Sequence, residues 1–231
     1  MFKALIFDVD GTLAETEEAH RHAFNDTFAE FGLNWHWSRE LYRTLLKTTG
    51  GKERMRDYAA NHLNIDPATV PVVEIHKRKT ARYGELISAG IVPLRPGVEA
   101  LINNARSNGV RLAVATTTNL PNVDRLIRAT MGVPAEDVFE VIAAGDMVKA
   151  KKPAPDVFQL ALDGLDLPAK DCLAFEDSLN GLKSALGADL ACLVCPSWYT
   201  SGDEFKGATA IVESYEETAS IEALNALFVP A

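Results

Sequence analysis

The sequence predicts a doubly wound α/β fold, in which helices cover both faces of a parallel sheet, with an all-helical segment inserted after the first strand. Residues 4–7 form an apolar run of strand length close to the start of the chain. Between residues 15 and 90, helical patterns follow one another with no convincing strand. From residue 92 onward, short apolar runs alternate with segments of helical periodicity, which is typical of parallel strands joined by helices.

The first expected strand ends in two carboxylates and a glycine turn, Asp8, Asp10 and Gly11. Four consecutive apolar residues suit a strand that is buried on both faces, and parallel sheets bind ligands just beyond the carboxyl ends of their strands. Side chains two residues apart on a strand point the same way, so both carboxylates could serve one divalent cation and an anionic substrate. A strand followed by a simple Asp/Gly turn explains the same residues, and both interpretations stand for this stretch alone.

The inserted segment is expected to be a domain of its own. Its helices are expected at residues 15–31, 38–46, 52–63 and 72–87. We expect residues 15–90 to form a helical cap domain, and residues 1–14 and 91–231 to form the α/β core domain. Because the insertion directly follows Asp8 and Asp10, it is placed to act as a lid over them.

The remaining strands and helices are expected to alternate along the core domain. The expected strands are residues 111–115, 138–143, 172–175, 190–194 and 210–212. One expected helix ends at residue 107, and the others span residues 123–131, 156–165, 179–186 and 221–227. Cys172, Cys192 and Cys195 lie in apolar surroundings, and the C-x-x-C pair falls on a strand, where positions three apart face opposite ways. We therefore expect core cysteines and no disulfide.

Composition excludes several classes of partner. The 231 residues are 47% hydrophobic and carry a formal net charge of −9, which gives no general attraction for nucleic acid or for an anionic membrane surface. No apolar run approaches transmembrane length, and the first strand begins too early for a signal peptide to precede it. We expect a cytoplasmic monomer that binds a small molecule, and no contact with nucleic acid or membrane.

Hydroxyl and lysine residues follow the next strands of the core. Thr116, Thr117 and Thr118 come directly after the strand at 111–115, where hydroxyls and backbone N–H groups at a helix entrance could bind an oxyanion or merely cap the helix. Lys149, Lys151 and Lys152 lie in a proline-bounded loop before the helix at 156–165, and a solvated surface loop is the alternative for such a run.

A second acidic pair, Glu176 and Asp177, ends the strand at 172–175. These carboxylates could bind a metal ion, or Asp177 and Ser178 could cap the helix that follows. The joint occurrence of an acidic pair, a hydroxyl, a lysine and a second acidic pair, each at or near a strand-to-helix crossing, resembles the four ordered motifs of the haloacid dehalogenase (HAD) superfamily. That resemblance covers the whole chain and implies a Rossmann-like parallel-sheet core with an inserted all-helical C1 cap.

The resemblance implies a role for each motif residue. Asp8 would be the nucleophile that forms an aspartyl-phosphate, and Asp10 would protonate the leaving oxygen and then activate water. Thr116 and Lys152 would hold the transferring phosphoryl oxygens. Mg²⁺ would be bound by the Asp8 carboxylate, the Asp10 backbone carbonyl and Asp177, with Glu176 nearby.

Within the superfamily the chain is similar to the β-phosphoglucomutase-like branch, and within that branch to the CbbY proteins of Calvin-cycle bacteria. The resemblance rests on residues 7–17, 48–54, 112–118, 144–148 and 176–181. It implies a phosphatase that converts xylulose 1,5-bisphosphate, an inhibitory by-product of Rubisco, into xylulose 5-phosphate. A sugar phosphomutase, a phosphatase of phosphoglycolate or of another sugar phosphate, and a non-catalytic binding protein are the alternatives, although the last would be expected to have lost an essential residue.

The inserted segment supplies cations that a bisphosphate would need. Lys52 and Arg54 follow a Gly-Gly pair that would allow a ligand to approach, and Lys79 lies on a later helix. A solvated basic face is the alternative. Glu17 and His20 lie on the first helix of the insertion, and a similar histidine in the mutase branch assists the residue that corresponds to Asp10. An exposed or capping histidine explains His20 equally well.

Overall fold

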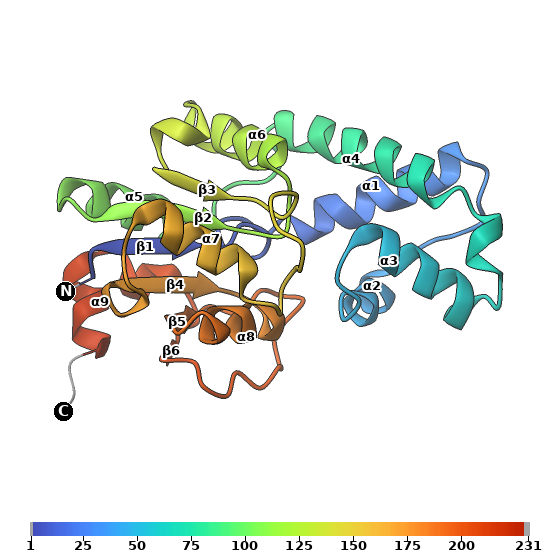
Figure 1. Ribbon diagram of the computed structural model, residues 1–231. Helices are drawn as coiled ribbons and strands as arrows, with labels where there is room; N and C mark the ends of the chain where they lie inside the picture. The colour runs from blue at the N-terminus through green and yellow to red at the C-terminus, as the bar shows by residue number, and fades with distance from the viewer. Residues whose placement is uncertain (1, 229–231) are drawn as a thin grey trace. The chain divides into compact units, whose positions relative to one another are not determined.

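The computed structural model describes residues 2–228, which form two compact units (Figure 1). The core unit holds the described residues up to Glu15 and those from Val92 onward, and the helical unit is Thr16–Ile91. The division therefore falls one residue later at each junction than the boundaries expected from the sequence. No helix among the described residues has both the length and the apolar character that crossing a membrane requires.

The core unit is built on a six-stranded sheet in which every neighbouring pair is parallel. Its strands are β1 (Ala4–Phe7), β2 (Arg111–Ala115), β3 (Val141–Ala143), β4 (Cys172–Glu176), β5 (Ala191–Val194) and β6 (Ala210–Ile211). The spatial order is β3-β2-β1-β4-β5-β6, so the chain winds outward from β1 in both directions. The predicted doubly wound fold is confirmed, and its topological switch point lies at the carboxyl ends of β1, β2 and β4.

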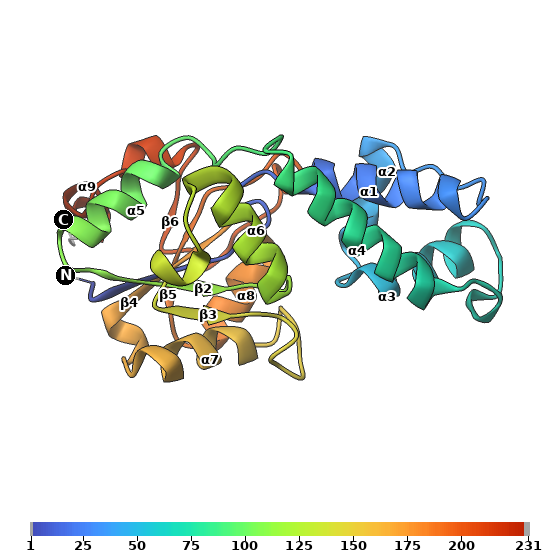
Figure 2. The same cartoon turned by 90° about the horizontal axis from the view of Figure 1, so that it is seen from above.

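Helices cover both faces of this sheet. They are α5 (Val98–Ser107), α6 (Leu120–Met131), α7 (Asp156–Leu165), α8 (Leu179–Gly187) and α9 (Ile221–Phe228). Figure 2 shows α7 and α8 on one face and α5, α6 and α9 on the other. Phe158 of α7, Leu182 of α8 and Ile6 of β1 belong to one buried hydrophobic cluster. Leu5 and Phe7, which alternate with Ile6 along β1, are buried as well, so both sides of β1 are apolar.

The expected strand at 138–143 is wrong in its first half. A 3₁₀ turn at Ala135–Asp137 precedes β3, and the N–H groups of Val138 and Phe139 donate back to the Ala135 carbonyl, at 3.1 and 2.9 Å. Phe139 is buried, but its side chain reaches the ring of Phe7 from a turn, at 6.4 Å between ring centres. An apolar pattern alone does not separate these two ways of burying a residue.

The helical unit consists of α1 (Glu17–Glu30), α2 (Arg39–Leu45), α3 (Gly51–Asp57) and α4 (Val72–Ser88), with shorter turns at Tyr58–His62 and Pro67–Thr69. The predicted helix at 52–63 changes into a π-helical turn after Asp57. Two ion pairs, Arg78 with Glu30 at 2.6 Å and Arg82 with Asp26 at 2.8 Å, join α4 to α1 in antiparallel order.

Aromatic side chains fill the interior of the helical unit. Trp37 is fully buried and lies 4.6 Å from Phe24 and 4.9 Å from Phe28, measured between ring centres. Trp35 packs on Phe28 and Tyr58. Both tryptophans therefore belong to the interior packing of the helical unit. The three cysteines lie in the core unit, where all are buried and none forms a disulfide.

Candidate active site

The loop after β1 carries the first acidic pair and is held in a tight turn. The Asp8 N–H donates to the Phe175 carbonyl at 3.0 Å, which continues the pairing of β1 with β4 by one residue. Gly11 then has φ +86°, a conformation that glycine adopts without strain. A Cβ atom at Gly11 would collide with the Asp177 carboxylate. The glycine therefore lets the loop after β1 approach the loop after β4.

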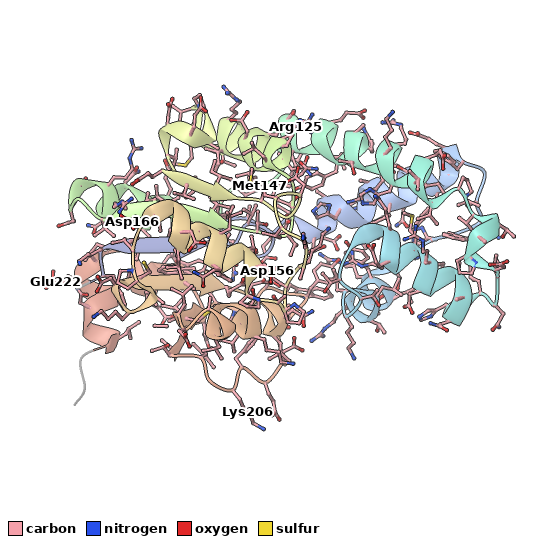
Figure 3. All side chains as sticks on the ribbon, in the orientation of Figure 1. Arg125, Met147, Asp156, Asp166, Lys206 and Glu222 are labelled. Atoms are coloured by element: carbon pink, nitrogen blue, oxygen red, sulfur yellow. The ribbon has the colours of Figure 1, made fainter. Side chains whose placement is uncertain are left out.

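Lys152 joins the strand-end loops from the segment between β3 and α7. Figure 3 marks two points on this segment, the exposed Met147 and Asp156 at the start of α7. The Lys152 ammonium donates to Asp8 Oδ1 at 2.5 Å, to Glu176 Oε1 at 2.5 Å and to the Ala115 carbonyl at 2.8 Å. Its three N–H donors are thus used by residues from the ends of β1, β4 and β2.

Asp177 completes a compact acidic cluster. Asp8, Glu176 and Asp177 are all buried, and each offers a carboxylate oxygen within 4.8 Å of those of the other two. The backbone of Asp177 is fixed by Thr200, whose hydroxyl donates to the Asp177 carbonyl at 2.7 Å. Gly181 makes room for Glu176, because a Cβ atom there would collide with the Glu176 carboxylate.

The buried charges of this cluster do not balance without a cation. Burial raises the pKa of Asp8 from 3.8 to about 8; the Lys152 ammonium acts in the opposite direction, while the charges of Glu176 and Asp10 add to the rise. Burial by itself lowers the pKa of Lys152, but the two carboxylates that it contacts raise it above its usual range. Lys152 therefore stays charged, and Asp8 holds a proton below about pH 8 when no ion is bound.

The residues present fit a divalent cation. With Asp8 ionised, the three carboxylates and the one ammonium would carry a net charge of −2, which a doubly charged ion would neutralise. Carboxylate and backbone carbonyl oxygens are the ligands that Mg²⁺ prefers. Asp8, Asp177 and Glu176 could hold the ion through side chains. Asp10 is only half-buried, and its side chain lies outside the cluster, so its expected contribution would come from the backbone carbonyl.

The threonine segment begins at the carboxyl end of β2. Thr116 is fully buried, and its hydroxyl accepts a hydrogen bond from the Thr118 N–H at 3.2 Å. Thr117 and Thr118 are half-buried. The helix cap is provided by Asn119, whose side chain accepts from the Asn122 N–H at 3.0 Å. Capping of α6 therefore does not require Thr116, which directly follows the carbonyl that Lys152 contacts.

In the helical unit, Arg54 and Glu17 are connected through a tyrosine. The Tyr42 hydroxyl donates to Glu17 Oε2 at 2.8 Å and accepts from Arg54 Nη1 at 2.9 Å. Arg54 Nε also donates to the Leu45 carbonyl at 3.2 Å, and the side chain is buried. Arg54 thus has a structural role within its unit, whatever it contributes to a ligand.

Lys79 and His20 form a second group in this unit. Lys79 Nζ lies 2.6 Å from His20 Nδ1 and 4.4 Å from the centre of the Phe24 ring, and the His20 ring stacks on Tyr83 at 3.8 Å. His20 is thus a packed residue rather than an exposed one. Lys52 lies in the first turn of α3 and is half-buried, with no hydrogen bond or ion pair among the described residues.

Two residues that bear on the site were missed by the sequence reasoning. Thr200 belongs to no motif and follows β5 by several residues. The Arg95 side chain is largely buried, and its Nη1 donates to the Gly11 carbonyl in the loop after β1. Because Arg95 and Thr200 act on backbone carbonyls, no pattern of side chains reveals their partners. The one available signal was a lone arginine beside the Pro96-Gly97 turn.

Known proteins are similar to this chain in sequence and in fold. The family model of the haloacid dehalogenase-like hydrolases matches residues 2–189. The chain is 53% identical to protein CbbY of Cereibacter sphaeroides over 225 residues, which covers 97% of each chain. It is 60% identical to protein CbbY of Rhodobacter capsulatus over 206 residues, or 89% of this chain and 90% of that protein.

A solved structure extends this similarity to three dimensions. The crystal structure of a CbbY mutant from Rhodobacter sphaeroides, in complex with xylulose-(1,5)bisphosphate, superimposes with a TM-score of 0.92 at 53% identity. The match covers 97% of this chain and 99% of that one. Both the core unit and the helical unit therefore have counterparts in that protein.

Proposed function

Since the chain belongs to the haloacid dehalogenase-like hydrolases, and within them is similar to the CbbY proteins as its motifs predicted, we propose that it is a Mg²⁺-dependent sugar phosphatase that acts through an aspartyl-phosphate. The observation that carries this proposal is the buried contact of Lys152 with Asp8 beside the acidic cluster of Glu176 and Asp177. A carboxylate, a fixed cation and ligands for a second cation are the parts that a phosphoryl transfer of this kind needs.

In the first step, a carboxylate oxygen of Asp8 attacks phosphorus. The new Asp8 O–P bond forms while the ester P–O bond breaks, and Asp10 gives its proton to the leaving sugar oxygen. Thr116 and Lys152 hold the phosphoryl oxygens during this transfer. Mg²⁺, when bound, neutralises the repulsion between the carboxylate and the phosphoryl group.

In the second step, water attacks the same phosphorus atom. Asp10, now ionised, takes a proton from the water, the Asp8 O–P bond breaks, and phosphate leaves with both aspartates restored. Asp10 is suited to this exchange because it is half-buried, so that water can reach it. It is also not one of the three carboxylates of the acidic cluster beside Lys152.

For the substrate we propose xylulose 1,5-bisphosphate, with xylulose 5-phosphate and phosphate as products. Support comes from the 53% identity to a protein crystallised with that sugar bisphosphate. Lys52, whose ammonium has no protein partner among the described residues, is the proposed contact for the phosphate that is not cleaved. Arg54, Lys79, His20 and Glu17 would shape that subsite. Action in the Calvin cycle, the cytoplasmic location and the monomeric state stay predictions.

Phosphate release from a panel of substrates tests the proposal. The panel contains xylulose 1,5-bisphosphate, ribulose 1,5-bisphosphate, β-glucose 1-phosphate and phosphoglycolate, each with Mg²⁺ and with excess chelator. We expect the highest kcat/KM on xylulose 1,5-bisphosphate, no turnover with chelator, and no turnover by Asp8→Asn, which removes the nucleophilic charge at nearly constant volume. Faster turnover of another member would reassign the substrate, and isomerisation of β-glucose 1-phosphate would indicate a mutase.

A further inference from the structure

Arg95 has a largely buried side chain, and the proposed chemistry assigns it no role. Its side chain is 9% exposed, both of its terminal nitrogens donate hydrogen bonds, and its Nε forms an ion pair. Nη1 donates to the carbonyls of Gly11, at 2.5 Å, and Cys195, at 2.7 Å. Nη2 donates to the Pro196 carbonyl at 3.0 Å and to Cys195 Sγ at 3.1 Å, and Nε lies 3.4 Å from Glu15 Oε1.

These contacts join two segments that are far apart in sequence. One is the catalytic loop after β1, where Arg95 contacts the Gly11 carbonyl. The other is the segment after β5, where it contacts Cys195 and Pro196. Arg95 itself is held by its backbone, because its N–H donates to the Leu13 carbonyl at 2.8 Å. The ring of Tyr215 packs against the guanidinium at 5.3 Å.

Both segments lead to Asp177. On one side, Gly11 lies against the Asp177 carboxylate. On the other, the segment after β5 continues to Ser197, whose N–H donates to Thr200 Oγ1 at 2.9 Å, and the Thr200 hydroxyl donates to the Asp177 carbonyl at 2.7 Å. A shift of either segment would therefore move Asp177 relative to the loop that carries Asp10.

We propose that Arg95 is a positioning residue for the cation site, which it serves by locking the catalytic loop and the segment after β5 to each other. The inference rests on the proposed function only in taking Asp10 and Asp177 as ligands of Mg²⁺. A residue behind the ligands of a metal typically changes metal affinity or activity by about 10- to 100-fold when it is replaced. Lysine cannot substitute, because its three donors leave a point charge and cannot span four acceptors on two segments.

The test measures Mg²⁺ binding directly, by calorimetric titration of substrate-free protein. The variants are Arg95→Lys, Arg95→Gln and the matched control Arg111→Lys, which alters an arginine that pairs with Glu140 at the opposite end of β2. We expect both Arg95 variants to bind Mg²⁺ about 10- to 100-fold more weakly, and the control to stay within about twofold. With p-nitrophenyl phosphate, the Mg²⁺ concentration for half-maximal activity should rise by the same factor, while KM for the ester changes less than about threefold.

Thr200→Val supplies a second, independent arm. Because Arg95 and Thr200 act on the same segment, the loss of Mg²⁺ affinity in the double variant with Arg95→Lys should be smaller than the product of the two single losses. Fully multiplicative losses of Mg²⁺ affinity in the double variant would overturn the proposal.

The single variants can overturn it as well. They would do so if the Arg95 variants kept wild-type Mg²⁺ affinity and only their melting temperature fell, or if both Arg95 variants failed to fold. Absence of sugar phosphatase activity in the wild type would instead refute the proposed function, since the titration needs no substrate.

Discussion

The raised pKa of Asp8 predicts that the metal-free protein loses stability as pH rises. Its carboxyl has a pKa of about 8 in the folded protein against 3.8 ordinarily, because burial outweighs the attraction of Lys152. Between these two values the folded state binds one proton at Asp8 that the unfolded state has released. The free energy of unfolding therefore falls with pH, by about 1.4 kcal/mol per pH unit for one such group. The stabilisation is fully present below about pH 4 and is lost above about pH 8.

The experiment compares wild-type protein with Asp8→Asn, which cannot titrate. Urea unfolding in excess chelator is measured at pH 5, 6 and 7, all inside the window. Relative to the variant, the wild type should lose nearly 3 kcal/mol across these two units. Asp171→Asn is the control, since Asp171 pairs with Lys3 on the surface and its pKa is lowered, so its difference from wild type should not change above pH 5.

Two results would refute this reasoning. A difference between wild type and Asp8→Asn that is flat with pH would mean that Asp8 is ionised in the metal-free protein, with Lys152 outweighing burial. In that case Mg²⁺ would not displace a proton from Asp8 when it binds. A fall of the same slope in saturating Mg²⁺ would also contradict the argument, because an ion that binds the ionised carboxylate stabilises the folded state more strongly as pH rises.

Three further predictions concern single residues. Asp10→Asn should lower turnover by ~10²-fold or more, because both steps lose their proton carrier, and rapid-quench measurement of turnover and phosphoenzyme checks this; wild-type rates would reassign the acid. Asp177→Asn should weaken Mg²⁺ binding in a calorimetric titration more than it raises KM for the substrate, and equal effects would count against a metal ligand. Lys52→Ala should lower kcat/KM by about 10- to 100-fold on xylulose 1,5-bisphosphate but less on p-nitrophenyl phosphate, and equal losses would indicate a structural role.

The parts of the fold with local signals were predictable. The strand at Arg111–Ala115 and the helix at Asp156–Leu165 have the bounds that their periodicity predicts, since apolar spacing and flanking turns fix both ends. The strand at Val141–Ala143 was predicted three residues too long. Backbone hydrogen bonds to Ala135 decide that boundary, and a sequence records which side chains are apolar but not which carbonyl each N–H selects.

The site divides in the same way. Asp8, Lys152 and Glu176 lie on different strand-end segments, and the parallel sheet brings them into contact because its carboxyl ends share one edge. Arg95 and Thr200 escaped prediction because they contact main-chain atoms, which every residue has and which therefore leave no trace in composition. The sequence predicted that Arg54 binds a ligand, but it gave no sign of the contact between Arg54 and Tyr42. Burial of a cation within helical packing depends on tertiary structure.

Within the core unit, the two ends that flank the insertion lie side by side: Ala14 forms an antiparallel bridge with Leu94, and the Arg95 N–H donates to the Leu13 carbonyl. The chain therefore leaves and re-enters the core at neighbouring points, although residues 16–91 lie between them. An inserted domain whose ends are adjacent can be lengthened, exchanged or replaced without changing the register of any strand. The strand-end residues Asp8, Lys152 and Asp177 and the residues of the helical unit are thus encoded in separable stretches of sequence, so the insertion can change while these three stay in place.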